Sequence, residues 1–365
     1  MDRDTTMKHL ELFSGIGGFR KAFELLEQDK MLTIENIGFS EIDTNAKKTY
    51  MANYDISDEL EIGDICEFTK DRENIEGLPD IDIITAGFPC QSFSMMGKQE
   101  GFKDDRGQMF FRIMDIVKVK KPKYLLLENV KNLYTHDKKR TFKRIKDELT
   151  SAGYNIYYDI FNTADFGLPQ NRRRVFIFAT LNGIPDEVEF SNNVIKEHYL
   201  KHKKDMSVCK YNNVLDILEE KVSDKYFLSD KMKKTILSDG TGGFKAKSEI
   251  NQMIARPLTA SMHKMHRACQ DNYYSQDYIS TKGIVNPILT HRKCELSSLP
   301  IRRITPREAY MLQGFNKKFV ENAYNAGVSD TALYKQAGNA VSVNVAYSVL
   351  HYLCINNMLK SGCII

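Results

Sequence analysis

Short apolar runs alternate with amphipathic stretches over residues 10–180 of this 365-residue chain. The apolar runs have the length of buried strands, and the stretches between them carry apolar residues at helical spacing. Strands that alternate with helices form a parallel sheet with helices on both faces. The pattern predicts a doubly wound α/β domain with strands at 9–13, 34–40, 81–85, 124–128, 155–161 and 174–180, and helices at 18–28, 108–120 and 140–153.

The rhythm changes after Leu181 to a polar stretch that is rich in Lys, Asn and Ser and continues to about Arg303. A regular pattern of apolar residues returns at 305–315 and in a helix-like stretch at 340–359. The second stretch contains enough apolar residues to pack into the core of the first part of the chain. We therefore predict one discontinuous α/β domain with a smaller, irregular, mostly β domain inserted into it. The α/β domain takes residues 1–185 plus 330–365, and the inserted domain with its hinge takes 186–329.

Composition narrows the class of protein. The apolar fraction of 42% fits a globular chain, no apolar run approaches the roughly 20 residues of a membrane helix, and the polar start lacks the features of a signal peptide. Seven cysteines without a CxxC pair predict reduced thiols rather than a disulfide framework. We expect a cytoplasmic protein that does not interact with membranes. The net charge of +4 decides little, because basic clusters such as 138–144 either contact phosphates or lie on solvated faces.

Ligands of open parallel sheets bind beyond the carboxyl ends of the strands. After the first predicted strand, Gly15, Gly17 and Gly18 allow either a cofactor turn or a simple tight turn. After the second, Glu41 is placed to accept hydrogen bonds from ribose hydroxyls, or is an ordinary surface carboxylate. Asp64 is a further candidate acceptor, for an adenine amino group.

Cys90 and Glu128 follow two further strands. Each has a structural alternative, a packed thiol for Cys90 and a helix cap for Glu128, but together they offer a nucleophile and an acid at strand ends. Arg172 and Arg174 are two residues apart on a segment that we expect to be extended, so their side chains should share one face. Two guanidinium groups there could clamp a phosphate, steady a carboxylate, or lie on a solvated edge.

The order of these blocks resembles that of the DNA (cytosine-5)-methyltransferase family, which depends on S-adenosylmethionine and is found mostly in bacterial restriction-modification systems. The blocks span most of residues 9–180 and 300–346. They read LFSGIGGFR, SEID, GDI, GFPCQSFS, DDRGQMFF, LLENV, QNRRRVF, RRITPREAYMLQGF and YKQAGNAVSVNVA.

The resemblance implies a Rossmann-like domain that binds S-adenosylmethionine. Phe13 would stack near the adenine, the Gly15–Gly18 turn would lie against the methionine part, and Glu41 would bind the ribose. The full set implied for the cofactor is Phe13, Gly15, Gly17, Gly18, Glu41, Ile42, Asp64, Ile65, Asn339 and Val341.

The resemblance also implies that Cys90 is the nucleophile, that Glu128 holds the cytosine edge, that Arg172 and Arg174 support them, and that Pro89 shapes the loop. The chemistry explains these residue types, because C5 of cytosine is a poor nucleophile until a thiolate adds at C6. Hydrogen bonding or protonation at N3 by Glu128 would stabilise the charge that develops. No metal is required.

The target cytosine must leave the duplex before it can react. The stretch 94–107 is rich in Gly and charge and fits a loop that closes over the flipped base. Arg106 is expected to contact DNA there, and Met95 and Met96 are candidates to fill the vacated stack.

The inserted domain is expected to read the target sequence through the segment 255–274, which resembles the Thr-centred recognition segment of the family. Its candidate base or phosphate contacts are Arg256, Thr259, His263, Lys264 and Arg267. Two H-x-x-C pairs, at 266–269 and 291–294, have zinc-like spacing, but the matched family segment needs no metal.

The resemblance implies an enzyme that methylates the C5 carbon of a specific cytosine in double-stranded DNA. It further implies a monomer of bacterial or phage origin, with a cognate restriction endonuclease acting separately on the same site. A tRNA cytosine-5 methyltransferase built on the same motifs is the nearest alternative, and the long insert favours DNA. A nicotinamide oxidoreductase would leave Cys90 and Glu128 unexplained, and an inactive DNA-binding relative would not need the complete catalytic set.

Overall fold

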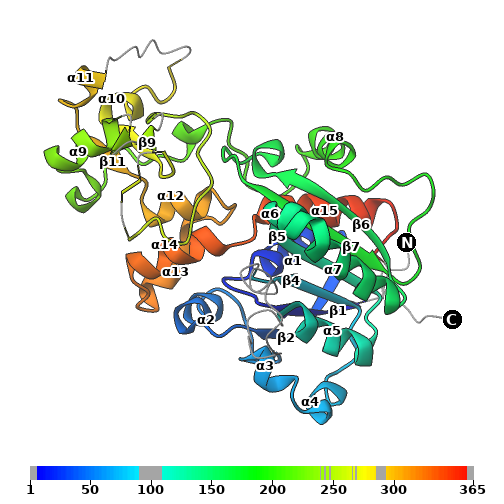
Figure 1. Ribbon diagram of the computed structural model, residues 1–365. Coiled ribbons are helices and arrows are strands. Elements are labelled where there is room, and N and C mark those ends of the chain that lie inside the picture. The colour runs from blue at the N-terminus through cyan, green and yellow to red at the C-terminus, as the bar shows by residue number, and fades with distance from the viewer. Residues whose placement is uncertain are drawn as a thin grey trace. The chain divides into compact units, whose positions relative to one another are not determined.

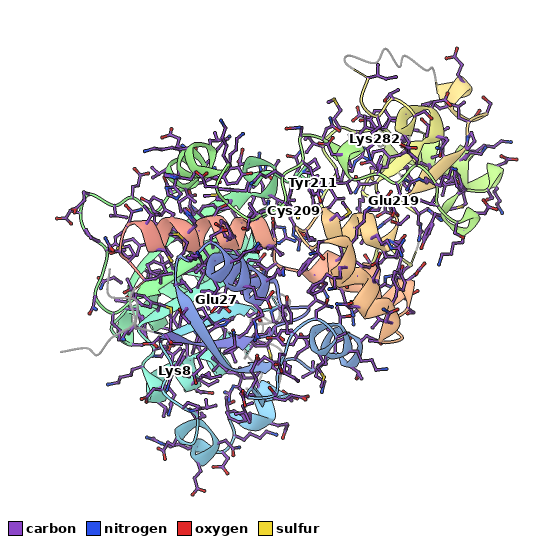
Figure 2. The ribbon with its side chains drawn as sticks, turned by 180° about the vertical axis from the view of Figure 1, so that it is seen from behind. Lys8, Glu27, Cys209, Tyr211, Glu219 and Lys282 are labelled. Carbon is purple, nitrogen blue, oxygen red and sulfur yellow. The ribbon has the colours of Figure 1, made fainter. Side chains whose placement is uncertain are left out.

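The structure is a computed structural model, which describes residues 6–89, 109–238, 240–241, 244–245, 248–264, 266–267, 269–284 and 293–359. Contacts divide the chain into two compact units. The first comprises Met1–Asn162, Arg173–Val208 and Val341–Ile365, and the second comprises Thr163–Arg172 and Cys209–Ala340. Cys209, where the long segment of the second unit begins, is labelled in Figure 2.

The sheet of the first unit contains seven strands among the described residues. They are β1 (Thr6–Leu12), β2 (Thr33–Ser40), β3 (Leu60–Glu61), β4 (Ile83–Gly87), β5 (Tyr124–Val130), β6 (Asn155–Asn162) and β7 (Arg173–Thr180). Their order across the sheet is β3-β2-β1-β4-β5-β7-β6. Pairing is parallel from β3 to β5, and β7 runs antiparallel to both β5 and β6.

Helices cover the sheet. They are α1 (Gly18–Gln28), α2 (Thr44–Met51), α3 (Ile65–Phe68), α4 (Arg72–Glu76), α5 (Met109–Lys120), α6 (Asn132–Thr135), α7 (Arg140–Ser151), α8 (Asn192–His202) and α15 (Val343–Ile355), with a 3₁₀ turn, η3 (His136–Lys139). One group contains α1, α8 and α15, and another contains α3, α4, α5 and α7 (Figure 1). The doubly wound fold predicted from the sequence is confirmed.

Strand β1 shows why its sequence forms a central strand. Leu10 and Leu12 are fully buried in the core that α5 and α7 complete. His9 and Glu11 point to the opposite face, because side chains alternate along a strand, and the His9 ring lies 4.6 Å from that of Phe23 on α1. Both faces of the strand are therefore covered, as expected for a parallel sheet.

The second unit is smaller and less regular. Its helices are α9 (Asp230–Leu237), α10 (Gln276–Ile279), α11 (Lys293–Leu296), α12 (Pro306–Met311), α13 (Lys317–Asn325) and α14 (Asp330–Asn339), with the 3₁₀ helices η4 (Thr163–Phe166), η5 (Val214–Asp216) and η6 (Asp224–Tyr226). Its strands are β8 (Gly240–Thr241), β9 (Phe244–Lys245), β10 (Tyr273–Ser275) and β11 (Ile301–Arg303). The prediction of a mostly β insert is wrong for the part of this unit that the structure describes, because these strands are two or three residues long while α13 and α14 are nine and ten.

The unit boundaries also differ from the predicted insert at 186–329. Residues 163–172 and 330–340 belong to the second unit, and residues 186–208 belong to the first. Side chains explain the first difference: the Gln170 amide donates to the carbonyl of Leu312 at 2.8 Å and accepts from the backbone N–H of Leu258 at 2.9 Å. The second follows from the packing of α8 on α15.

Three histidines meet where α8 contacts α15. His198 and His202 lie one turn apart on α8, and His198 Nε2 is 2.8 Å from Nδ1 of His351 on α15. One of these two rings donates the hydrogen bond and the other accepts it, so the pair requires at least one neutral ring. Burial is the main cause that lowers the pKa of both His198 and His351 to about 4.

We expect the free energy of unfolding to fall as the pH is lowered from about 6.5 towards 4. In this window the two histidines stay neutral in the folded protein, whereas the unfolded chain takes up protons near the ordinary histidine pKa of about 6.5. Their contribution to stability is therefore complete above pH 6.5 and is lost as the pH falls through the window. Urea unfolding at a series of pH values measures it. His351→Gln removes one titrating group, so the free energy of unfolding of this variant should fall less steeply with decreasing pH. A fall as steep as that of wild type would rule out these histidines as the source of the pH dependence.

Candidate active site

The glycine turn follows β1 at the carboxyl edge of the sheet. Phe13, Gly15 and Gly17 have positive φ angles of 53°, 56° and 78°, a conformation that costs glycine little. A Cβ atom on Gly17 would lie 2.4 Å from the Tyr54 ring, and one on Gly18 would lie 2.7 Å from the carbonyl oxygen of Val341. Around Gly15, by contrast, an added Cβ would meet no described atom within 4 Å. The turn is thus packed tightly behind Gly17 and Gly18 and open at Gly15.

Glu41 organises the neighbouring strand end. Its carboxylate accepts a hydrogen bond from the backbone N–H of Gly15 at 2.8 Å, and also from the N–H groups of Ile42 and Asp43. Ile42, just beyond it, exposes 71% of its surface, which is unusual for a large apolar side chain. The structure therefore brings the turn, a carboxylate and an exposed apolar side chain together at neighbouring strand ends.

The other four residues predicted for the cofactor have different surroundings from one another. Asp64 is exposed and caps α3, accepting from the Cys66 N–H at 2.8 Å. Ile65 is only 3% exposed and its side chain belongs to the core. Val341 packs on Gly18 and lies 3.2 Å from the position of an added Cβ on Gly87. Asn339 is exposed at the end of α14 in the second unit.

Glu128 lies at the end of β5, where it is paired in register with Gly87 at the end of β4. Its side chain is largely buried, and its Oε1 lies 3.1 Å from Nε of Arg174 on β7. An added Cβ on Gly87 would be 3.8 Å from Glu128 Oε2. The predicted acid is therefore held by the predicted arginine and faces the last residue of β4, three residues before Cys90 in the sequence.

The segment that leads to Cys90 is held by Asn129, a residue for which the sequence analysis predicted no role. The Asn129 side chain donates to the carbonyl of Phe88 at 2.7 Å, and both residues are buried. Pro89 follows and is exposed. Asn129 stands in the ENV block beside Glu128, so its place in that block was the available signal. Cys90, Met95, Met96 and Arg106 lie outside the described residues.

Arg172 and Arg174 do not share one set of partners. The Arg174 guanidinium contacts Glu128, whereas Arg172 is 1% exposed and donates to the backbone carbonyls of Leu258, Gly338 and Ala340 at 2.9–3.1 Å. Arg174 thus contacts the carboxylate that it is expected to support. Within the second unit, Arg172 instead joins its own segment to the segment at Leu258 and to the end of α14.

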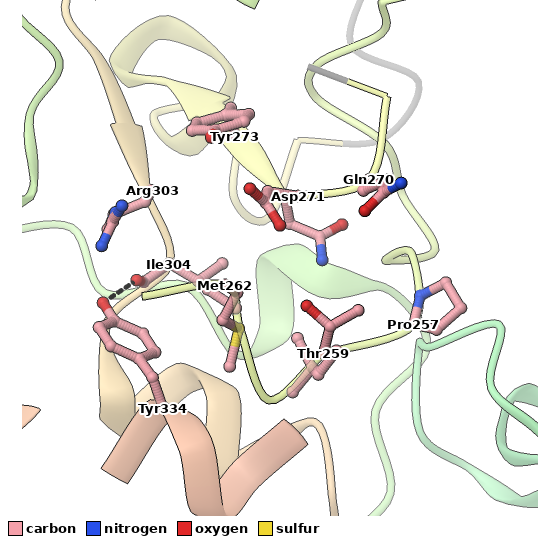
Figure 3. Close-up of a pocket in the computed structure, with 11 residues that line it drawn as sticks. Pro257, Thr259, Met262, Gln270, Asp271, Tyr273, Arg303, Ile304 and Tyr334 are labelled. Atoms are coloured by element: carbon pink, nitrogen blue, oxygen red, sulfur yellow. Dashed lines mark hydrogen bonds between the residues drawn. The ribbon is translucent and has the colours of Figure 1, made fainter. Parts of the chain in front are cut away.

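The segment predicted to read DNA is built around Thr259 in the second unit (Figure 3). The Thr259 hydroxyl accepts from Arg267 at 2.7 Å, and the same guanidinium lies 3.2 Å from the Asp271 carboxylate. The Asp271 carboxylate also accepts from the Arg267 backbone N–H. Thr259, Asp271 and Tyr334 line a small cavity of about 20 Å³, which has room for about one water molecule.

The predicted DNA contacts therefore fall into two groups. Arg256 donates to the carbonyls of Glu249 and Asp271, and Arg267 is engaged as described above, so both hold the segment from within. Lys264 is exposed. His263 is half-buried, and burial lowers its pKa.

Gly338 sets how closely α14 approaches this segment. A Cβ atom there would lie 2.3 Å from both the Thr259 carbonyl carbon and the Ala260 backbone nitrogen. Both are backbone atoms, so a side-chain rotation cannot relieve the clash.

We expect Gly338→Ala to displace the Thr259 segment and to weaken binding of the DNA that this segment is predicted to read by about 5- to 150-fold, since overpacking costs about 1–3 kcal/mol. Titration of labelled duplex measures the effect. Thr331→Ala, at an exposed position on the same helix, should bind as wild type. Wild-type affinity in Gly338→Ala would contradict the tight approach of α14.

The described residues contain no helix long and apolar enough to cross a membrane. They also contain no group of three or more His, Cys, Asp or Glu side chains arranged for a metal ion. His291, of the second H-x-x-C pair, lies outside them.

Comparison with known proteins gives consistent matches. The family model described as C-5 cytosine-specific DNA methylase matches residues 7–354. Type II methyltransferase M1.ScrFI of Lactococcus lactis subsp. cremoris is 38% identical over 343 residues, covering 94% of this chain and 76% of that protein. Type II methyltransferase M.HaeII of Haemophilus aegyptius is 36% identical over 344 residues, covering 94% and 91%.

Among solved structures, Entamoeba histolytica methyltransferase EhMeth superposes with a TM-score of 0.72 at 21% identity, covering 98% of this chain and 100% of that one. The S. pombe Dnmt2 methyltransferase superposes with a TM-score of 0.70 at 20% identity, covering 97% and 98%. Likeness at this level of identity concerns the fold.

Proposed function

Because the chain belongs to the C-5 cytosine-specific DNA methylase family and is a DNA (cytosine-5)-methyltransferase, we propose that methyl transfer takes place at the carboxyl ends of β1, β2, β4 and β5. The observation that carries this proposal is the Glu128 carboxylate, held by Arg174 opposite Gly87. Cys90 follows three residues later in the chain.

Covalent addition of Cys90 to the base explains why a nucleophile and an acid are needed together. The thiolate sulfur forms a bond to C6 of the flipped cytosine, and the electron pair of the C5–C6 double bond becomes available at C5. Glu128 stabilises the charge at N3 by donating its proton or a hydrogen bond. After C5 has gained the methyl group, a base removes the C5 proton, the S–C6 bond breaks, and aromaticity returns.

The glycine turn and its neighbours fit S-adenosylmethionine, which the methyltransferase family uses and which supplies the methyl group as an electrophilic sulfonium. The open backbone at Gly15 gives access for the amino-acid part, and the Glu41 carboxylate has lone pairs left for ribose hydroxyls beside its three backbone donors. Exposed Ile42 offers an apolar surface for the adenine. Phe13, Gly17, Gly18, Asp64 and Val341 complete the proposed pocket, and the buried Ile65 would contribute its backbone.

We propose that the second unit reads double-stranded DNA. Thr259 and the exposed Lys264 are the proposed contacts, with His263 beside them, while Arg256 and Arg267 keep the segment in shape. The relatives are named Type II methyltransferases, which supports a restriction-modification role with a separate endonuclease.

The tRNA alternative has less support. The Dnmt2 structure shares the fold at 20% identity, whereas the relatives at 36–38% identity are named Type II methyltransferases.

Bisulfite sequencing of a plasmid incubated with the protein and S-adenosylmethionine tests the function. The expected result is 5-methylcytosine at one position of one short recurring sequence. A parallel reaction with tRNA is the control, and methylation of tRNA with an unmodified plasmid would overturn the assignment of DNA as the substrate.

A further inference from the structure

Tyr54 lies directly behind the glycine turn. Its hydroxyl donates to the carbonyl of Gly17 at 2.7 Å, and its ring occupies the space into which a Cβ on Gly17 would project. The side chain is buried, and burial raises the pKa of Tyr54 well above its usual value. The hydroxyl is therefore a permanent donor to the turn.

The turn needs such support because the start of α1 has no local cap. Gly17 is the N-cap residue of α1 and has no side chain to offer, and capping groups usually satisfy the first N–H groups of a helix. The Glu11 carboxyl, reaching from β1, accepts from the backbone N–H groups of Phe19 and Arg20 instead. Glu11 thus holds the first N–H groups of α1, and Tyr54 holds the turn at the Gly17 carbonyl.

Neighbouring side chains fix the Tyr54 ring in turn. The Arg20 guanidinium lies 5.2 Å from its centroid and pairs with Glu59, and the Tyr50 ring lies 4.7 Å away. Tyr50 itself directs its hydroxyl to Glu11 at a long 3.4 Å. This arrangement gives Tyr54 one orientation, with its hydroxyl on the Gly17 carbonyl.

We propose that Tyr54 is a positioning residue for the cofactor: its hydroxyl sets the Gly15–Gly18 backbone in the shape that receives the amino-acid end of S-adenosylmethionine. The proposal rests on the function proposed above and adds a residue outside the expected pocket. Without the hydroxyl, the Gly17 carbonyl keeps the N–H of Lys21 as a donor but loses its second one, so the turn is held less rigidly and ligands that touch it bind less tightly.

Tyr54→Phe removes the hydroxyl and keeps the ring. Isothermal titration should show that the Kd for S-adenosylhomocysteine rises about 3- to 10-fold, the usual effect of one buried hydrogen bond. The Kd for 5′-methylthioadenosine, which lacks the amino-acid end, should change less than twofold. Tyr154→Phe is the matched control, since its buried hydroxyl donates to the carbonyl of Pro122 and not to the turn, and both ligands should bind it as they bind wild type.

Comparing two ligands on one variant separates positioning from loosening of the fold. Equal weakening of both ligands by Tyr54→Phe, or no weakening of either, would overturn the role of Tyr54. Wild-type protein that binds neither ligand would instead overturn the proposed cofactor pocket.

Discussion

Cys90→Ala is expected to abolish methyl transfer while target DNA is still bound. Without the thiolate, C5 of cytosine remains too poor a nucleophile to accept the methyl group, whereas the residues of the second unit that are proposed to bind DNA are unchanged. A tritium-transfer assay measures the first effect, and duplex titration measures the second.

The same cysteine should become trapped on DNA that contains 5-fluorocytosine. Fluorine at C5 takes the place of the proton that a base must remove before the S–C6 bond can break. Wild-type protein therefore remains attached to the DNA in denaturing gels. Cys354→Ala is the matched control, because burial raises the pKa of the Cys354 thiol to about 12 and this thiol is therefore inert. Undiminished turnover in Cys90→Ala would eliminate the covalent mechanism.

Glu128→Gln is expected to lower kcat by about 10²- to 10⁴-fold, the usual contribution of a positioned acid. The amide keeps the shape of the side chain but cannot deliver a carboxyl proton to N3. The Kd for S-adenosylhomocysteine should stay near that of wild type, because Glu41 and the glycine turn are unchanged. Single-turnover kinetics on the target duplex measure the loss.

Two further variants locate this effect. Arg174→Gln, which removes the guanidinium 3.1 Å from Glu128, should lower kcat by about tenfold or more, since hydrogen bonds to charged groups contribute about 1.5–3 kcal/mol. Glu73→Gln, at an exposed position on α4, should leave kcat unchanged. A kcat for Glu128→Gln within threefold of wild type would remove Glu128 from the chemistry.

Local patterns in the sequence predicted the first unit closely. Helix α1 has the predicted bounds, and the six predicted strands are present with ends shifted by a few residues. Strand β3 was missed because two exposed residues carry no apolar run. The antiparallel direction of β7 could not be predicted, because an apolar run reads the same for either direction of a strand.

The second unit was predicted less well because distant contacts shape it. Gln170, Arg172 and Gly338 each pack against backbone that lies more than 75 residues away in sequence, and no local periodicity reports such partners. The sequence analysis also grouped Arg172 with Arg174, because side chains two residues apart on an extended segment share one face. In the structure, β7 begins at Arg173, between them, so the two side chains serve different units.

The hydrogen bonds of Arg172 bear on how new target specificities can arise. Its guanidinium binds main-chain carbonyl oxygens, among them that of Leu258 immediately before Thr259, and every amino acid supplies such an oxygen. Substitutions of exposed side chains in the segment around Thr259 therefore leave this anchor intact. If this segment reads DNA as we propose, its specificity can change one residue at a time, without a compensating change in the part of the chain that holds it.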